Sequence, residues 1–342
     1  MHLSKLALLF VLSLHTATRL LACDLCRCAT PRLEVVHQKS SGFYAAVAEQ
    51  FTHFGTDRFN GDEVANPTDQ HLDSAITQVV AGVTFGQNRF GLQLNVPYIH
   101  RSYQRPEGFA IERGHESGLG DLSLLANVVV FKAGGLRPDR DGLLSGDGKS
   151  VIKPPRGEPN FSASLNVLTG VKFPTGETSR LKEEFHEVEI EGAPESGIHG
   201  HDLALGTGSY DGVFGLQSFV RYRAVFFQAD AQFTLRGHGH YSYRFAHDLQ
   251  GNGGPGVYLY RRAGNSIALQ AVVAGETKGY DRFQGERAKD SGLTSLYIGP
   301  RVTAAFGRIR GDLGVDLPVL MHTTSFQTTA DYRIRAGLSI HF

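Results

Sequence analysis

Hydrophobic and polar residues alternate along much of this chain, and the pattern is clearest over its last eleven residues. One face of this stretch takes Tyr332, Ile334, Ala336, Leu338, Ile340 and Phe342, and the other takes Arg333, Arg335, Gly337, Ser339 and His341. A period of two is that of a β-strand, since a helix would repeat every three to four residues. Eleven residues is also about the length of a tilted strand that crosses a bilayer. The pattern therefore predicts a membrane-crossing strand at the end of the chain.

Further stretches with strand character precede it at roughly even spacing. They cover 43–54, 76–85, 90–100, 119–132, 160–174, 213–222, 225–236, 256–262, 266–276, 294–306 and 309–318. The total of about twelve is even, as a single-chain barrel with both ends on one side of the membrane requires. A soluble β-sandwich would alternate in the same way, so the connections between the strands decide between the two folds.

Those connections alternate between short and long. Short turns are expected at 86–89, 221–223, 262–265 and 306–308, and long polar loops at 55–70, 102–118, 175–203, 237–255, 279–291 and 319–331. This is the layout of bacterial outer-membrane barrels. We therefore predict an all-β fold, a transmembrane antiparallel up-and-down β-barrel of about 12 strands over 43–342. Residues 133–158 are long where a short turn belongs, and their Gly, Pro and charge favour a periplasmic insertion.

The alternation also predicts which side chains face the inside of the barrel. The charged members that we expect to line the lumen and set its selectivity are Asp230, Arg236, Arg301, Arg310, Asp312, Asp316, Arg333 and Arg335. Mixed charges inside a small barrel either pair into a network that fills the lumen or line a narrow wet pore. About twelve strands lies between the filled eight-stranded barrels and the open sixteen-stranded porins. We expect a narrow pore, partly occluded by the N-terminal tail.

The N-terminus and the composition indicate the compartment. Residues 1–22 have the pattern of an export signal, with Lys5 ahead of the apolar run 6–14. Beyond it no apolar run approaches eighteen residues, so any membrane crossing must be by strands. The 34 basic and 34 acidic residues balance, which gives no support to nucleic-acid binding. We expect an exported protein of the outer membrane of a Gram-negative-type bacterium, in contact with outer-membrane lipid.

The chain has no Trp, although the interface belts of membrane proteins usually carry Trp and Tyr. The aromatic girdles are therefore expected to consist of Phe residues with Tyr98, Tyr222, Tyr258, Tyr260 and Tyr332.

All three cysteines, Cys23, Cys26 and Cys28, lie in the tail 23–42 directly after the signal. Three interpretations stay open. The first is an ordinary disulfide with one spare thiol. The second is a lipid anchor on Cys23, because the residues before it resemble a lipoprotein signal. The third is metal binding or redox exchange, which C-x-x-C spacing suits. No C-x-x-C-H motif is present, so we expect no haem attached to this chain.

Two histidine pairs form a weaker candidate metal site. His199 and His201 are separated by one glycine, as are His238 and His240. In a strand both imidazoles of a pair would point the same way, although such pairs in loops are usually solvated turns. No nucleophile elbow, metalloprotease helix or phosphate loop occurs, so we expect neither enzyme activity nor a cofactor.

The last strand resembles the C-terminal recognition strand of bacterial outer-membrane barrels. It ends on Phe342 and carries alternating apolar residues back to Tyr332. The resemblance implies that these two residues belong to the signal read by the barrel assembly machinery.

Three glycine-rich motifs lie at predicted strand ends: Gly118–Asp121, Gly170–Gly176 and Leu205–Gly212. Together with Phe342 they resemble the outer-membrane transporter family linked to the meta-pathway of phenol degradation. The resemblance implies an outer-membrane barrel that passes small organic or aromatic solutes. We interpret the glycines as backbone geometry, since they permit tight bends and close strand approach.

Two functional hypotheses follow. The first is a passive channel for small molecules. The alternative is a structural sheath around a periplasmic cytochrome, because a C-x-x-C near the start of the mature chain also resembles the sheath barrels of porin–cytochrome conduits.

Overall fold

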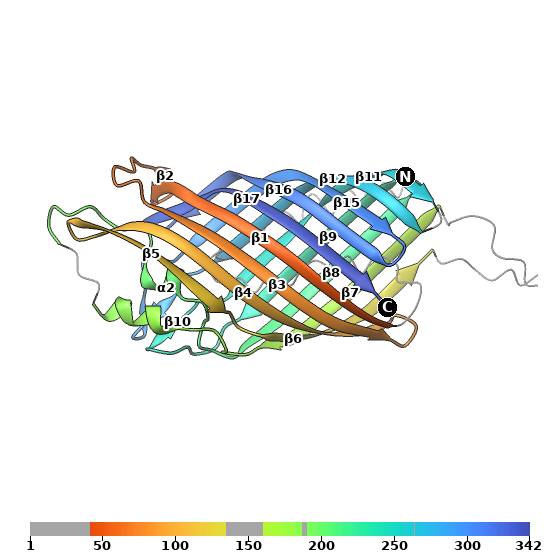
Figure 1. Cartoon of the computed structure of the whole chain (residues 1–342), viewed down its shortest axis with the longest axis horizontal. Helices are drawn as coiled ribbons and strands as arrows, with labels where there is room; N and C mark the ends of the chain where they lie inside the picture. The colour runs from red at the N-terminus through yellow and green to blue at the C-terminus, as the bar shows by residue number, and fades with distance from the viewer. Residues whose placement is uncertain (1–41, 135–159, 187–189, 263) are drawn as a thin grey trace, which may run out of the picture.

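A computed structural model describes residues 42–134, 160–186, 190–262 and 264–342. Within these ranges the chain forms one cylinder of tilted strands (Figure 1). The signal, the cysteine tail and nearly all of the 133–158 segment lie outside the described residues, so the interpretations of Cys23, Cys26 and Cys28 stay predictions. No helix in the described ranges is both long and apolar enough to span a membrane.

Twelve long strands make up the wall of the cylinder. They are β1 (Gly42–Phe59), β3 (His71–Phe85), β4 (Phe90–Glu107), β6 (Ser123–Ala133), β7 (Phe161–Lys172), β8 (Asp211–Tyr222), β9 (Val225–Leu235), β11 (Asp248–Arg262), β12 (Asn265–Lys278), β15 (Leu293–Phe306), β16 (Ile309–Thr323) and β17 (Phe326–His341). Neighbours in this order pair antiparallel, and β17 also pairs with β1, so the sheet closes on itself. The predicted barrel of about twelve strands is confirmed, and each predicted stretch overlaps one of these strands.

Shorter strands lie in the connections. They are β2 (Asp62–Glu63), β5 (Ala110–Leu119), β10 (Tyr243–Arg244), β13 (Arg282–Phe283) and β14 (Glu286–Arg287). The predicted loop at 102–118 is wrong, because β4 continues to Glu107 and the chain returns as β5 through a turn at Gly108, whose φ is +59°. Polar residues there suggested a loop, but a hairpin that projects beyond the wall needs no apolar face.

Several strands extend further toward the long loops than predicted. β17 begins at Phe326 rather than Tyr332, and β11 begins at Asp248 rather than Gly256. Gly and Pro between 251 and 255 are poor strand formers, yet pairing with β9 and β12 on both sides holds this stretch in the sheet. The alternation also fails near the loop end of other strands, because apolar residues such as Leu72 face inward there.

The short turns and the C-terminus lie at one end of the barrel, and the long loops lie at the other (Figure 1). Gln87 and Asn88 have positive φ values of 59° and 61°, which a two-residue hairpin turn requires. Gly307, at φ 58°, serves the β15–β16 turn. In outer-membrane barrels the end with short turns faces the periplasm, so the long loops face outward from the cell.

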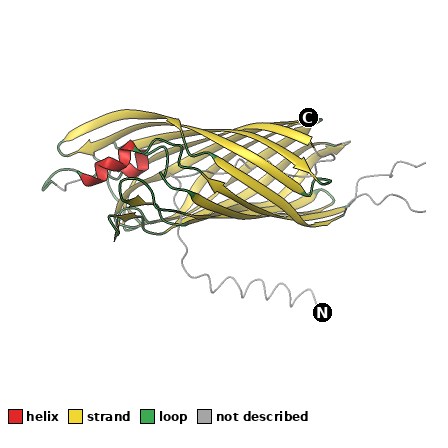
Figure 2. Ribbon diagram, turned by 90° about the horizontal axis from the view of Figure 1, so that it is seen from below, coloured by secondary structure: helices red, strands yellow, loops and turns green. Residues whose placement is uncertain are grey.

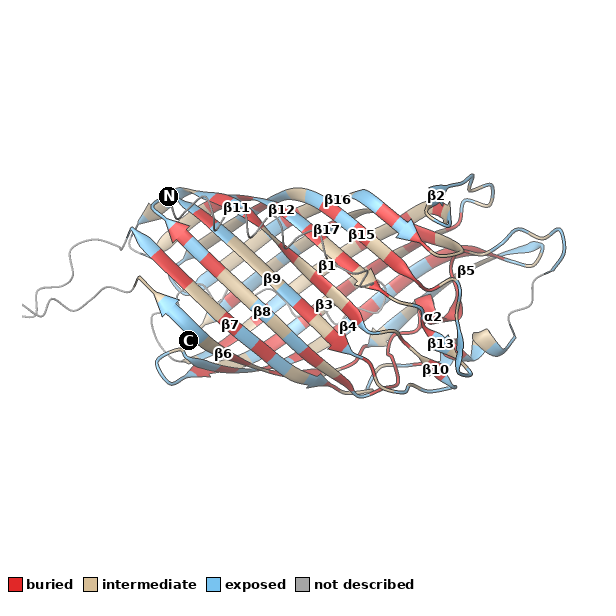
Figure 3. Cartoon of the chain, turned by 180° about the vertical axis from the view of Figure 1, so that it is seen from behind, coloured by how far each residue is buried: buried red, intermediate tan, exposed pale blue. Residues whose placement is uncertain are grey.

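The exterior of the wall is apolar, and buried and exposed residues alternate along the strands (Figure 3). Exposed aromatic residues gather near the short turns: Phe43, Phe85, Phe90, Phe131, Phe161, Tyr222, Tyr260, Phe306 and Phe342. They form the lipid-facing girdle of an outer-membrane barrel without any Trp. The prediction for Tyr258 is wrong. A bulge between Tyr258 and Tyr260 shifts the alternation, and Tyr258 packs inside against Phe226.

The seams between strands differ in length. β1 and β17 pair at fifteen positions, from Tyr44 with His341 to Phe59 with Phe326. β4 and β6 pair at only six positions, from Phe90 with Val128 to Asn95 with Ser123, because β5 takes over the edge of β4 from Tyr98 onward. On the loop side of the start of β6, β4 and β6 are therefore no longer paired, and we call this break in the wall the notch.

Candidate functional site

The connection between β7 and β8 turns into the outer mouth of the barrel. It contains the 3₁₀ helix η3 (Ser179–Phe185) and the short helix α2 (Gly200–Leu203), which lie at the loop end (Figure 2). All four residues of α2 are buried, and Leu203 is fully buried. The prediction of a long polar loop at 175–203 is correct for its polarity but misses that the loop enters the barrel. We call residues 190–205 the mouth loop.

Apolar side chains from the wall surround the mouth loop. The cluster joins Ile198 and Leu203 of the loop to Phe54, Leu72, Tyr103, Val272, Ala274, Leu293, Tyr297, Met321 and Ala330 of the wall. Most of these wall residues face inward at the loop end of their strands, where alternation alone would predict a wet lumen. The sequence does carry a signal for this core, namely apolar residues at inward positions near the loop ends of the strands. A search for simple alternation passes over these residues, because they break the expected polar inner face.

Arginines and a glutamine of the outer wall hold the mouth loop by hydrogen bonds. The Arg101 guanidinium donates to the carbonyl oxygens of Asp202 at 2.5 Å and Ala204 at 2.6 Å, so a buried cation meets the C-terminal end of α2. Arg105 donates to the carbonyl oxygen of Ile198 at 3.3 Å, and it also forms a 2.8 Å ion pair with Glu183 of the preceding η3. The side-chain oxygen of Gln70 accepts the backbone N–H of Gly197 at 2.8 Å. The loop is therefore bonded to the wall at several separate points.

A buried chain of ion pairs follows the outer end of the wall on the β6 side of the notch. Lys172 Nζ lies 2.7 Å from Asp121 Oδ2 and 2.8 Å from Asp211 Oδ2. Arg236 continues the chain, at 3.0 Å from Asp211 and 2.6 Å from Asp248. Every one of these side chains is almost fully buried. Two cations thus lie among three carboxylates, and we call these five residues the notch network.

The three glycine-rich motifs meet in this network. Asp121 comes from the first motif, Lys172 from the second and Thr207 from the third, and Thr207 donates to Asp121 Oδ2 through both its backbone N–H and its hydroxyl at 2.8 Å. A Cβ on Gly206 would lie 2.6 Å from Asp121 Oδ1 and 2.7 Å from the Cα of Gly176, so only glycines fit here. The interpretation as backbone geometry alone is therefore incomplete, because the motifs also supply Asp121, Lys172 and Asp211 of the notch network.

The predicted lumen residues face inward, and several are paired. Arg335 forms an ion pair with Asp316, and Arg333 lies 3.3 Å from Glu276 and 4.2 Å from the centre of the Tyr297 ring. Arg236 belongs to the notch network. The remaining members, Asp230, Arg301, Arg310 and Asp312, also point into the barrel from β9, β15 and β16. Paired charges thus occupy the middle of the lumen as well as its outer end.

The histidine pairs make contacts other than a shared ion. His201 Nδ1 lies 3.0 Å from Glu184 and its Nε2 lies 3.5 Å from Asp202, while His199 Nε2 lies 3.2 Å from Asp290. In the second pair, His240 contacts the Thr178 hydroxyl and His238 is exposed. No group of three or more His, Cys, Asp or Glu residues in the described part of the chain is arranged to hold a metal.

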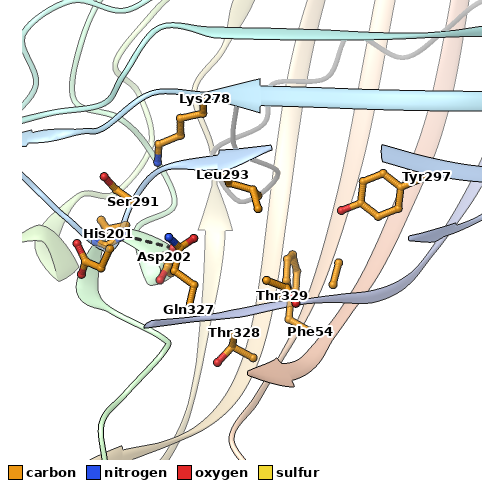
Figure 4. Close-up of a pocket in the computed structure, with 12 residues that line it drawn as sticks. Phe54, His201, Asp202, Lys278, Ser291, Leu293, Tyr297, Gln327, Thr328 and Thr329 are labelled. Carbon is orange, nitrogen blue, oxygen red and sulfur yellow. Dashed lines mark ion pairs between the residues drawn. The ribbon is translucent and has the colours of Figure 1, made fainter. Parts of the chain in front are cut away.

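His201 links the mouth loop to carboxylates on two sides. Figure 4 shows it beside Asp202, facing Lys278 and Tyr297 of the wall across a small cavity. The cavity measures about 20 Å³, room for a water molecule. Burial opposes the charged form of the imidazole. The carboxylates of Asp202 and Glu184 outweigh burial and hold the pKa of His201 well above its usual value of 6.5.

We expect alkaline pH to loosen the mouth loop. A group whose pKa is raised on folding contributes stability that is fully present below its unfolded pKa and is lost as pH rises through the folded pKa. Amide hydrogen exchange over 198–205, corrected for intrinsic rate, should therefore accelerate above neutral pH. His201→Gln should abolish this step, whereas His238→Gln, which changes an exposed imidazole, should keep it. An unchanged pH profile in His201→Gln would assign the step to another group.

Solved structures similar to this chain are outer-membrane barrels. The COG4313 outer membrane channel from Pseudomonas putida F1 superposes with a TM-score of 0.54 at 12% identity, covering 90% of this chain and 97% of that one. The beta domain of the Bordetella autotransporter Brka gives a TM-score of 0.46 at 11% identity, covering 89% of this chain and all of that one. No family model and no curated protein sequence matches. The likeness at these identities concerns the fold, and together with the apolar exterior it identifies the chain as an outer-membrane β-barrel.

Proposed function

We propose that this barrel is a passive channel for small molecules across the outer membrane, without catalytic activity. The observation that carries the proposal is the polar lining of the barrel interior, set against an apolar exterior. A barrel that served only as a membrane anchor could fill its inside with apolar side chains. Charged and amide side chains instead face inward from most of the twelve strands.

The mouth loop and its contacts with the wall restrict the outer end of the route. Ion pairs there cross between loop and wall, as Arg105 does with Glu183, and the apolar cluster around Leu203 leaves little open space. A route restricted in this way suits small solutes rather than polymers. That the solutes are organic or aromatic follows only from the family resemblance of the glycine-rich motifs, and we retain it as part of the proposal.

The channel proposal predicts charge-dependent conductance. Removing a unit charge about 10 Å from a passing ion in water changes its energy by about 0.4 kcal/mol, roughly a twofold change in permeability. Arg301→Gln with Arg310→Gln should therefore shift the reversal potential in planar bilayers toward cation preference. Lys132→Gln, at the exposed turn end of β6, is the matched control and should leave it unchanged. A purified, folded barrel that never conducts would contradict the proposal.

A further inference from the structure

Polar amides line one continuous part of the barrel wall. Asn166 of β7 pairs in register with Gln217 of β8, Gln217 with Asp230 of β9, and Asp230 with Asn252 of β11. All four side chains face inward, and Gln228 lies two residues from Asp230 on the same face. No ion pair of the notch network reaches these positions. We call Asn166, Gln217, Gln228, Asp230 and Asn252 the amide lining.

Some of these amides lack a hydrogen-bond partner within the described ranges. The side-chain oxygens of Asn166 and Gln228 are buried without one, as is that of Gln270 on neighbouring β12. Asn166 is 6% exposed and Gln270 2% exposed. Burying an unpaired amide is costly, so native proteins leave such groups where water or a guest molecule pairs with them. These oxygens are therefore available to accept hydrogen bonds from water or from a polar solute inside the barrel.

The charges close to the amide lining have opposite signs. Asp230 accepts a 2.5 Å hydrogen bond from the Asn252 amide, and Arg301 pairs in register with Gln270. This carboxylate and this guanidinium, with β11 and β12 between their strands, bring one charge of each sign to this part of the wall. Amide groups carry no net charge, and each offers both a donor and an acceptor. The amide lining can therefore replace the hydrogen bonds that water makes with an uncharged polar molecule. It is less able to replace the hydration shell of an ion.

Aromatic rings adjoin the amide lining toward the short turns. Phe219 pairs in register with Gln228, its ring lies 5.9 Å from that of Phe226, and the Phe226 ring lies 5.0 Å from that of Tyr258. Binding sites for small molecules commonly combine apolar rings with a few polar groups that fix orientation. Rings beside amides suit a compact molecule with one apolar face and several hydroxyl or amide groups.

We propose that the amide lining binds passing solutes and makes the channel selective for small uncharged molecules that carry hydroxyl or amide groups. This inference rests on the proposed channel function. The preference for uncharged solutes is assigned to the amide lining. Of its residues, only Asp230 was among the charged residues that the sequence predicted to line the lumen.

The test is the swelling of proteoliposomes that contain the full-length barrel. Arabinose, an uncharged polyhydroxy molecule, is compared with glutamate, which is similar in mass but charged. Wild-type barrel should admit arabinose faster. The variant Asn166→Leu, Gln217→Met, Gln228→Met keeps side-chain size and removes the amides. It should lose arabinose entry by about fivefold, the factor that one net hydrogen bond supplies, while bilayer conductance stays within about twofold of wild type.

Two controls separate this inference from the channel proposal. Thr169→Val removes a hydroxyl from the outward face of β7 and should change neither rate. Arg310→Gln should alter ion selectivity and leave arabinose entry unchanged. No conductance and no swelling in wild type would overturn the channel itself. Two results would leave the channel in place and overturn only its preference for uncharged solutes. One is a conducting barrel that admits arabinose and glutamate equally, and the other is a conducting barrel whose potassium selectivity is abolished in the amide variant.

Discussion

Replacing Lys172 with Met should destabilise the folded barrel by about 3–5 kcal/mol, the usual cost of removing one partner from a buried ion pair. Lys172 is almost fully buried between Asp121 and Asp211, so its loss leaves two carboxylates close together with only Arg236 nearby. The urea midpoint of the heat-modifiable folded band on gels should fall accordingly.

The double variant Lys172→Met, Asp121→Asn should recover part of this stability, because it removes the carboxylate that lost its partner. Lys132→Met, which changes an exposed lysine, should stay within about 0.5 kcal/mol of wild type. Equal midpoints for Lys172→Met and Lys132→Met would show that the notch network contributes little to stability.

Deleting Phe342, or replacing Leu338 with Asp, should block assembly of the barrel. Leu338 is 59% exposed on the lipid face of β17 and pairs with Val47 across the closing seam. A carboxylate there is unfavourable, because charged side chains on the lipid face of a barrel are destabilising. Phe342 donates its backbone N–H to the carbonyl of Phe43 at 2.9 Å, so its loss also removes a bond at the end of that seam. The measurement is the amount of heat-modifiable barrel in the outer-membrane fraction.

Leu338→Ile keeps the apolar face and should assemble normally. Normal amounts of folded Leu338→Asp barrel would show that the outward face of β17 does not contact lipid. If Leu338→Asp fails while the deletion of Phe342 assembles normally, the apolar face is needed but the terminal aromatic is not part of an assembly signal.

Alternation predicted the lipid-facing half of this structure well. Residues such as Phe227, Leu313 and Leu338 face a uniform solvent of hydrocarbon, so their chemistry depends on position alone and a period of two reveals them. The inside of the barrel has no uniform solvent. Leu72 and Met321 face inward because a loop more than a hundred residues away in sequence packs against them, and no local pattern encodes that contact.

The charged interior shows the same division. The inward direction of Asp316 and Arg335 followed from alternation. Register places Asp316 opposite Arg333, and its ion pair is formed diagonally with Arg335. The notch network could not be found in this way. Asp121 and Lys172 lie fifty-one residues apart and Asp211 belongs to a third motif, so only the three-dimensional arrangement of strand ends brings them together. Their shared glycine-rich surroundings were the available signal.

The unequal seams also determine how the wall would respond to mechanical force. Backbone hydrogen bonds loaded along a strand edge share the load, so a seam resists in proportion to its length. The closure between β1 and β17 has fifteen pairs, and the junction between β4 and β6 has six. Tension on the cylinder would therefore part it between β4 and β6, three seams away from the β1–β17 closure. The ion pairs of the notch network all lie on the β6 side of that junction, from Asp121 ahead of β6 to Asp248 at the start of β11, so they stiffen one lip of the weak seam and leave the seam itself to its six backbone pairs.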